Sequence, residues 1–213
     1  MEEIEILSGK AVLKGNLIVQ KGSDSIIIFA HGSGSSRLSP RNSYVADEFN
    51  KAGFSTLLMD LLTIEEERRD MLTAQHRFDV DMLARRVISA TEWVNHNPAT
   101  SNFSVGYFGA STGAAAALIA AAQTPGIDAI VSRGGRPDLA MRFLPKVDAK
   151  VLLIVGGNDP EVIGMNKEAL KHLNEESKLE VIEGATHLFE EPGKMEEVAR
   201  LAEEWFLEHI GRG

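Results

Sequence analysis

Residues 109–113 read GASTG, and this short stretch decides how the rest of the chain can be interpreted. The run before it, FSVGYF at 103–108, is apolar and strand-like, and the run after it, AAAALI at 114–119, is typical of a helix. A lone serine between two glycines at such a junction has two explanations. Either Ser111 simply caps the helix that follows, or the backbone bends sharply to expose the Ser111 hydroxyl to a site.

Short apolar runs alternate with helical patterns along most of the chain. Residues 3–7 and 11–19 alternate polar and apolar side chains, as in the two strands of a hairpin with its turn at 8–10. Six further runs are rich in β-branched residues and most are too short for helices, which indicates parallel strands covered on both faces. These runs span residues 25–30, 54–59, 103–108, 127–132, 150–155 and 179–182.

Amphipathic helices are predicted between these strands. Apolar side chains recur at intervals of three and four over residues 78–94 and again over 195–206. Residues 137–144 leave room for a short helix but not for a separate cap domain. A hairpin followed by repeated strand–helix units predicts an α/β fold, with eight strands in a mostly parallel sheet and helices on both faces. We expect one domain over residues 1–213.

Composition and charge narrow the range of partners and reactions. The net charge is −9, so nucleic acid and anionic membrane surfaces, which need clustered positive charge, are expected to be poor partners. The chain has no cysteine, which excludes disulfides, thiolate metal sites and a cysteine nucleophile. Its first residues do not resemble a secretion signal, and no apolar run approaches the roughly 18 residues that span a bilayer. A cytoplasmic location is therefore expected.

The G-x-S-x-G pattern at 109–113 follows a predicted parallel strand, at the end where ligands gather in such sheets. In a nucleophile elbow the serine takes a strained backbone conformation. The positions two before and two after it must be small, because strand and helix backbones crowd there. The start of the following helix also favours developing negative charge. The pattern alone is a weak signal, because glycine and serine are common residues.

Candidates for a base and an acid follow at the next strand ends. A hydroxyl is a poor nucleophile unless a base accepts its proton, and a third group must orient that base. Asp159 lies in the first loop after the strand at 150–155, and His187 lies in the first loop after 179–182. The order serine, acid, histidine is that of the fold that carries the elbow. We therefore predict a catalytic triad of Ser111, Asp159 and His187, rather than an Asx turn and a surface histidine.

An oxyanion hole is predicted beside the serine. One donor is the backbone N–H of Thr112, directly after the nucleophile, and the second should come from the small-residue loop HGSGSS at 31–36. We favour the N–H of Ser33, with Gly34 as the alternative. A phosphate cradle is the competing interpretation, but this loop lacks the GK[ST] ending of a P-loop and the third glycine of a dinucleotide fingerprint.

Four arginines lie in loops at predicted carboxyl ends of strands, on an otherwise acidic chain. They are Arg37, Arg41, Arg133 and Arg136. Two or three of them could bind the carboxylate of a substrate, and the alternative is that they pair with the many acidic side chains. The charged stretch 63–75 is interpreted as a solvated loop or helix face, or as a flap beside the site. His31 and Asp60 are expected to make ordinary loop hydrogen bonds.

The chain resembles the α/β-hydrolase superfamily, and its small format without a cap is similar to the dienelactone hydrolase branch. Four blocks also resemble a subgroup whose members are sometimes fused to phosphoribosyltransferase domains. The blocks are HGSGSSRLSPRN (31–42), GYFGASTG (106–113), VSRGGRPDLA (131–140) and THLFEEPG (186–193). The enzymes that give the branch its name carry a cysteine nucleophile where this chain has Ser111. The resemblance therefore implies ester hydrolysis more securely than it implies a dienelactone substrate.

We expect a serine hydrolase that cleaves small, short-chain carboxylic esters through an acyl-enzyme. Aromatic content is low, at 6%, and no cap is predicted to enclose a long acyl chain. No cofactor and no metal are expected, since the six histidines show neither H-x-H nor H-E-x-x-H spacing. The alternatives are a non-catalytic module that binds a small molecule, and a thioesterase or lactone hydrolase acting on an anionic substrate. The expected partner is a small-molecule ester, and the sequence leaves the oligomeric state open.

Overall fold

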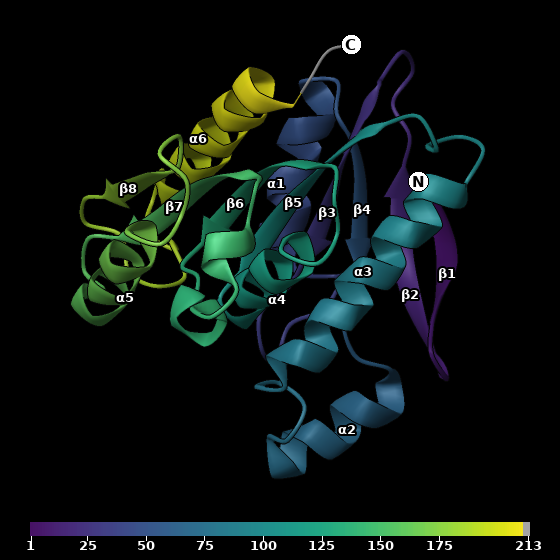
Figure 1. The fold of residues 1–213 in the computed structure, drawn as a ribbon, viewed down its shortest axis with the longest axis horizontal. Coiled ribbons are helices and arrows are strands. Elements are labelled where there is room, and N and C mark those ends of the chain that lie inside the picture. The colour runs from purple at the N-terminus through teal and green to yellow at the C-terminus, as the bar shows by residue number, and fades with distance from the viewer. Residues whose placement is uncertain (211–213) are drawn as a thin grey trace.

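The computed structural model describes residues 1–210, which form one eight-stranded sheet in the order β1-β2-β4-β3-β5-β6-β7-β8 (Figure 1). β2 pairs antiparallel with both β1 and β4, and all other pairs are parallel. The strands are β1 (Glu2–Ser8), β2 (Ala11–Ile18), β3 (Ser25–Ala30), β4 (Ser55–Met59), β5 (Ser104–Ala110), β6 (Ile127–Arg133), β7 (Lys150–Gly156) and β8 (Lys178–Ile182). This confirms the predicted eight-stranded, mostly parallel sheet.

The burial of the strands explains why their sequences differ. Every residue of β3 and β4 is buried, because helices cover both faces of the sheet there. In β1 the buried side chains Ile4 and Ile6 alternate with exposed ones, because this edge strand packs through one face only. Continuous apolar runs therefore mark the centre of the sheet, and alternation marks its antiparallel edge.

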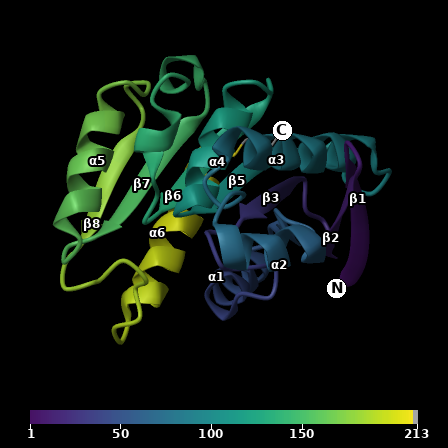
Figure 2. The ribbon, with the colours of Figure 1, turned by 90° about the horizontal axis from the view of Figure 1, so that it is seen from below.

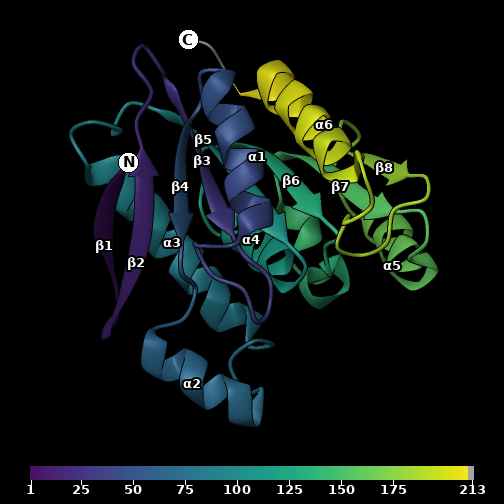
Figure 3. The ribbon, with the colours of Figure 1, turned by 180° about the vertical axis from the view of Figure 1, so that it is seen from behind.

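Helices cover both faces of the sheet, as predicted. Figures 1 to 3 show α1 (Pro40–Lys51) and α6 (Lys194–His209) on one face. On the other lie α3 (Val80–His96), α4 (Thr112–Ala121) and α5 (Pro160–Leu170). All ten residues of α4 are buried, so its alanine-rich sequence lets the helix lie close to its neighbours and shows no amphipathic stripe. Among residues 1–210, every helix is too short or too polar to cross a membrane.

One segment differs from its predicted form, and another takes the helical one of the forms stated for it. Residues 137–144 were expected to hold one short helix, but the chain forms two 3₁₀ helices, Pro137–Ala140 and Leu144–Lys146. The charged stretch 63–75 is mostly a helix, α2 (Ile64–Thr73), which lies beyond the carboxyl ends of the strands (Figure 1). A capping box begins α2: Thr63 Oγ1 accepts from the N–H of Glu66 at 3.2 Å, and Glu66 Oε2 accepts from the N–H of Thr63 at 2.8 Å.

Candidate active site

Ser111 is the single residue between β5 and α4, and its backbone angles are φ 51° and ψ −121°. Residues with a side chain rarely adopt this region of backbone conformation. It occupies the N-cap position of α4, but its side chain makes no capping hydrogen bond. The surrounding backbone fixes the bend: the N–H of Ser111 donates to the Arg133 carbonyl at 3.2 Å, and the Ser111 carbonyl accepts from the N–H of Arg136 at 3.2 Å. This geometry is that of a nucleophile elbow and not of an ordinary helix cap.

The two glycines of the motif are explained by crowding. A Cβ atom at Gly109 would lie 2.5 Å from Ala114 Cα. A Cβ atom at Gly113 would lie 2.2 Å from the Ala30 carbonyl oxygen and 2.3 Å from that of His31. Backbone atoms cannot move aside as a flexible side chain can, so only glycine fits at either position.

The other two predicted triad residues are in contact. Asp159 Oδ2 lies 2.8 Å from His187 Nδ1. Because a carboxylate only accepts, Nδ1 carries the proton of the neutral ring and Nε2 is left as the acceptor. Two backbone hydrogen bonds join the loop after β7 to the end of β8 and the loop that follows it. The N–H of Gly157 donates to the Ile182 carbonyl at 2.8 Å, and the N–H of Asn158 donates to the Ala185 carbonyl at 2.9 Å. Asp159 makes no capping bond to α5, so its carboxylate is directed to the histidine.

Ser111 and His187 line one cavity of about 180 Å³, together with Arg41 and Arg133. We refer to it as the His187 cavity. The structure thus places all three predicted triad residues at the carboxyl edge of the sheet. Within residues 1–210 the Ser111 hydroxyl makes no hydrogen bond to His187. Such bonds are often long before substrate binds and shorten only in the reacting complex.

The loop after β3 lies directly against the elbow. A Cβ atom at Gly32 would lie 3.1 Å from Ser111 Cβ, so the absence of a side chain there allows the close approach. Ser33 Oγ lies 3.0 Å from Thr112 Oγ1, so the two residues whose N–H groups are the predicted oxyanion donors are in contact through their side chains. The N–H of Thr112 is in the first turn of α4 and has no intrahelical acceptor. Ser33 lines the His187 cavity, which favours it over Gly34 as the second donor.

His31 holds this loop in place. Its Nε2 accepts from the N–H of Leu61 at 2.9 Å, so its Nδ1 carries the proton and donates to the Gly32 carbonyl at 2.9 Å. Burial lowers the pKa of His31, which keeps the ring neutral. Asp60 accepts from the backbone N–H of Arg37 at 2.8 Å. Both residues therefore make loop hydrogen bonds, in agreement with the expectation for them.

The four candidate arginines divide into two pairs. Arg37 forms ion pairs with Asp60 and with Glu3, and Arg136 binds both carboxylate oxygens of Asp138 at 2.8 and 2.7 Å. These two match the alternative stated for them, since each already has an acidic partner. Their surroundings give no support to a role in substrate binding.

Arg41 and Arg133 are the pair that lines the His187 cavity. Arg41 forms an ion pair with Glu190 at 2.8 Å, but its buried Nε has no hydrogen-bond partner within the described residues. Arg133 is only 7% exposed, and its nearest partner is the amide oxygen of Asn42, at 3.4 Å. Its Nε is also buried and unpartnered within residues 1–210. Burial, reinforced by the charge of Arg41, lowers the pKa of Arg133 to about 10.

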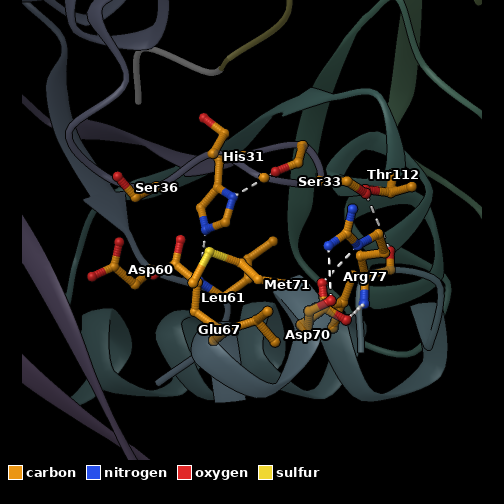
Figure 4. Close-up of a pocket in the computed structure, with 15 residues that line it drawn as sticks. His31, Ser33, Ser36, Asp60, Leu61, Glu67, Asp70, Met71, Arg77 and Thr112 are labelled. Atoms are coloured by element: carbon orange, nitrogen blue, oxygen red, sulfur yellow. Dashed lines mark hydrogen bonds and ion pairs between the residues drawn. The ribbon is translucent and has the colours of Figure 1, made fainter. Parts of the chain in front are cut away.

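A second cavity was not predicted from the sequence. It has a volume of about 100 Å³ and lies beneath α2, on the other side of the loop after β3 (Figure 4). We refer to it as the α2 cavity. Residues from the loops after β3 and β4, from α2 and the loop after it, from α3 and from the start of α4 line it, and Figure 4 shows labelled side chains from several of these segments. The Thr63-x-x-Glu66 capping signal could have predicted α2, but no local signal indicated the cavity.

The chain is similar to known proteins both in sequence and in fold. The model of the dienelactone hydrolase family matches residues 14–210. A crystal structure of a dienelactone hydrolase from Anabaena variabilis superposes with a TM-score of 0.96 at 54% identity, and covers 99% of this chain and 98% of that one. Est1E from Butyrivibrio proteoclasticus has a TM-score of 0.80 at 16% identity, with 97% and 98% covered, and so shows likeness of fold alone.

Curated relatives in two strains of Mycobacterium tuberculosis bear the name putative phosphoribosyl transferase. They are 50% identical over 210 residues, which cover 98% of this chain and 46% of each relative. The chain therefore spans about half the length of the curated relatives it matches. The family match, which extends from the second strand to the last described residue, is decisive for classification. The chain belongs to the dienelactone hydrolase family, a hydrolase family with the α/β-hydrolase fold.

Proposed function

We propose that the protein is a serine hydrolase that cleaves small, short-chain carboxylic esters through an acyl-enzyme. The observation that carries the proposal is one arrangement. Ser111, held at a positive φ with its hydroxyl uncommitted to a helix cap, shares a cavity with an imidazole that is oriented by Asp159. A module that only binds small molecules has no need of this combination.

The proposed reaction follows from the roles of these groups. Ser111 Oγ attacks the ester carbonyl while His187 Nε2 takes its proton, and Asp159 stabilises the imidazolium that forms. The N–H groups of Thr112 and Ser33 stabilise the oxyanion. His187 then protonates the leaving alkoxide, and the alcohol departs. A water molecule, deprotonated by the same histidine, attacks the acyl-enzyme, releases the acid and restores the Ser111 hydroxyl.

Hydrolysis of p-nitrophenyl acetate and butyrate tests the proposal. Ser111→Ala should reduce kcat at least about 1,000-fold, because the nucleophile is removed. Ser101→Ala, at an exposed serine outside the site, is the matched control and should retain wild-type activity. Circular dichroism checks that both variants fold. Near-normal turnover by folded Ser111→Ala contradicts the proposal, and a wild-type protein without any esterase activity favours the binding module.

Arg133 favours a second, narrower candidate: a thioester, lactone or ester that carries an anionic group. A buried cation without an acidic partner is costly, and a substrate carboxylate would supply the missing partner. Arg133→Gln should then raise KM for a carboxylate-bearing ester at least tenfold more than for a neutral ester of the same length. Arg136→Gln is the matched control, because Asp138 already neutralises that guanidinium. Equal changes for both esters would end this candidate.

The name of the curated relatives, the cellular location and the class of substrate complete the proposal. We attribute the phosphoribosyl transferase name of the curated relatives to the part of those proteins that this chain does not match. The net charge of −9 disfavours nucleic acid and anionic membrane as partners and so supports a small-molecule substrate. We also propose a cytoplasmic location.

A further inference from the structure

The α2 cavity adjoins the proposed reaction centre. Four apolar side chains contribute to its lining: Leu61, Leu62, Met71 and Leu83. Ser33 and Thr112, which carry the proposed oxyanion donors, also line it. Gly32, Ser33 and Ser35 line both this cavity and the His187 cavity, so the loop after β3 is their common border.

The two cavities differ in the groups that they present. Ser111, His187 and the two arginines Arg41 and Arg133 line the His187 cavity only. The α2 cavity is lined by Asp60, Glu67 and Asp70 as well as by Arg77. Asp60 is paired with Arg37 and Asp70 with Arg77, so Glu67 is the acidic side chain of this lining that has no ion pair within residues 1–210. A negative charge is therefore favoured beside Arg133 in the His187 cavity, whereas in the α2 cavity Arg77 is already paired and Glu67 disfavours an anion.

The chemistry of the proposed reaction assigns the two halves of an ester to the two sides. The leaving oxygen must face His187, because the histidine protonates it. The oxyanion must face the N–H groups of Thr112 and Ser33. The acyl substituent is then directed away from His187, and the apolar cavity that borders the oxyanion donors is the one beneath α2.

We propose that the α2 cavity binds the acyl chain of the substrate, as a short, uncharged, apolar group, while the leaving alcohol occupies the His187 cavity and carries any anionic group of the substrate. This inference rests on the proposed serine hydrolase function. It makes α2 the cover of the acyl site, and it makes Met71 and Leu62 determinants of acyl length.

The cover is anchored at both ends, so the cavity exists before substrate binds. At the start of α2, Glu66 takes part in the capping box and also forms an ion pair with Arg86 at 2.8 Å. Near its end, Asp70 accepts from the N–H of His76 at 2.6 Å and from Arg77 Nε at 2.7 Å, which fixes the following loop. A preformed apolar site selects chain length through contact with its walls.

Met71 and Leu72 provide a matched pair of variants. They are neighbours on α2 and both are largely exposed, Met71 at 69% and Leu72 at 88%, but only Met71 lines the cavity. We would measure kcat/KM of p-nitrophenyl esters from acetate to octanoate. Met71→Ala should move the preferred acyl chain to greater length by about two carbons and raise the octanoate-to-acetate ratio at least tenfold, at about fourfold per additional methylene accommodated. Leu72→Ala should leave the ratio within twofold of wild type.

A filling variant gives the opposite result. Leu62→Phe should lower the hexanoate-to-acetate ratio at least fivefold while acetate is still hydrolysed, because only the longer chain meets the added ring. If Met71→Ala and Leu62→Phe both keep the wild-type chain-length profile, the assignment of the α2 cavity is overturned. Hydrolysis that still depends on Ser111 would leave the proposed function standing in that case, and the two failures are thereby distinguished.

The position of the charge gives an independent readout. 4-Acetoxybenzoate carries its carboxylate on the alcohol half, and 4-nitrophenyl hemisuccinate carries it on the acyl half. The kcat/KM of each is divided by that of a matched neutral ester, and this ratio should be higher for 4-acetoxybenzoate. The reverse preference would place the acyl group in the His187 cavity and would overturn the inference.

Discussion

The charge of Arg133 is predicted to stabilise the binding of anionic ligands and to destabilise the folded protein. Arg133→Met tests both effects directly. The guanidinium is buried, lies close to Arg41 and has no carboxylate partner within residues 1–210. Methionine keeps an unbranched apolar stem of similar length but carries no charge. The variant should therefore unfold at a higher temperature than the wild-type protein, although it should lose affinity for anionic ligands.

The size of the expected stabilisation follows from the pKa of Arg133. Burial lowers the pKa of Arg133 by more than two pH units from its ordinary value, to about 10. At 1.36 kcal/mol per pKa unit, keeping the group charged in the folded state at pH 7 costs about 3 kcal/mol. The long contact to Asn42, at 3.4 Å, offsets little of this cost. We expect Arg133→Met to gain about 1–3 kcal/mol, and each kcal/mol corresponds to about 2–4 °C in Tm for a chain of this size.

Thermal unfolding followed by circular dichroism at pH 7, with and without a small carboxylate, measures both effects. The carboxylate should raise the Tm of wild-type protein and should leave that of Arg133→Met unchanged, because only the charged side chain gains a partner. A variant that is less stable than wild type by more than about 1 kcal/mol would refute the reasoning. It would show that Arg133 is a structural residue whose hydrogen bonds hold the loop after β6.

Three further results are expected. Gly113→Ala should cost at least about 3 kcal/mol of stability or prevent folding, because its Cβ would lie 2.2 Å from the Ala30 carbonyl oxygen. The control Gly164→Ala lies in α5, where an added Cβ has nothing within 4 Å, and it should be neutral or stabilising when thermal unfolding is measured. Asp159→Asn should lower kcat for p-nitrophenyl butyrate about 100- to 10,000-fold with little change in KM, and equal kcat would remove Asp159 from the mechanism. Competitive inhibition by a small carboxylate should weaken as the pH rises through about 10, where Arg133 loses its charge, and inhibition that stays constant to pH 11 would count against that residue.

The fold was predictable because its strongest signals are local. The run at 25–30 matches β3 in both bounds, since a strand covered on both faces is apolar throughout and ends where polar residues begin. The helix α2 was not assigned, because its charged sequence has no apolar stripe and its position depends on Asp70 binding the loop at His76 and Arg77. The segment 137–144 became two 3₁₀ helices instead of one helix, which the length of the connection alone could not predict.

The candidate site was predictable only in part, for a similar reason. Ser111, Asp159 and His187 each follow a recognisable strand, and strands of one parallel sheet bring their ends together. The arginines could not be separated by sequence, because their partners depend on contacts between distant segments. Arg41 meets Glu190, 149 residues away, and Arg133 meets Asn42, 91 residues away. The α2 cavity is built from six segments, and no single segment predicts it.

Covalent labelling by a fluorophosphonate probe, located by mass spectrometry, tests the central claim that Ser111 is a nucleophile activated by His187. The account predicts one adduct, on the peptide that contains Ser111. Labelling should be slowed at least about 100-fold in His187→Gln, because the base is lost, and should be absent in Ser111→Ala. Folded wild-type protein that stays unlabelled, or an adduct that persists in Ser111→Ala, would contradict the account.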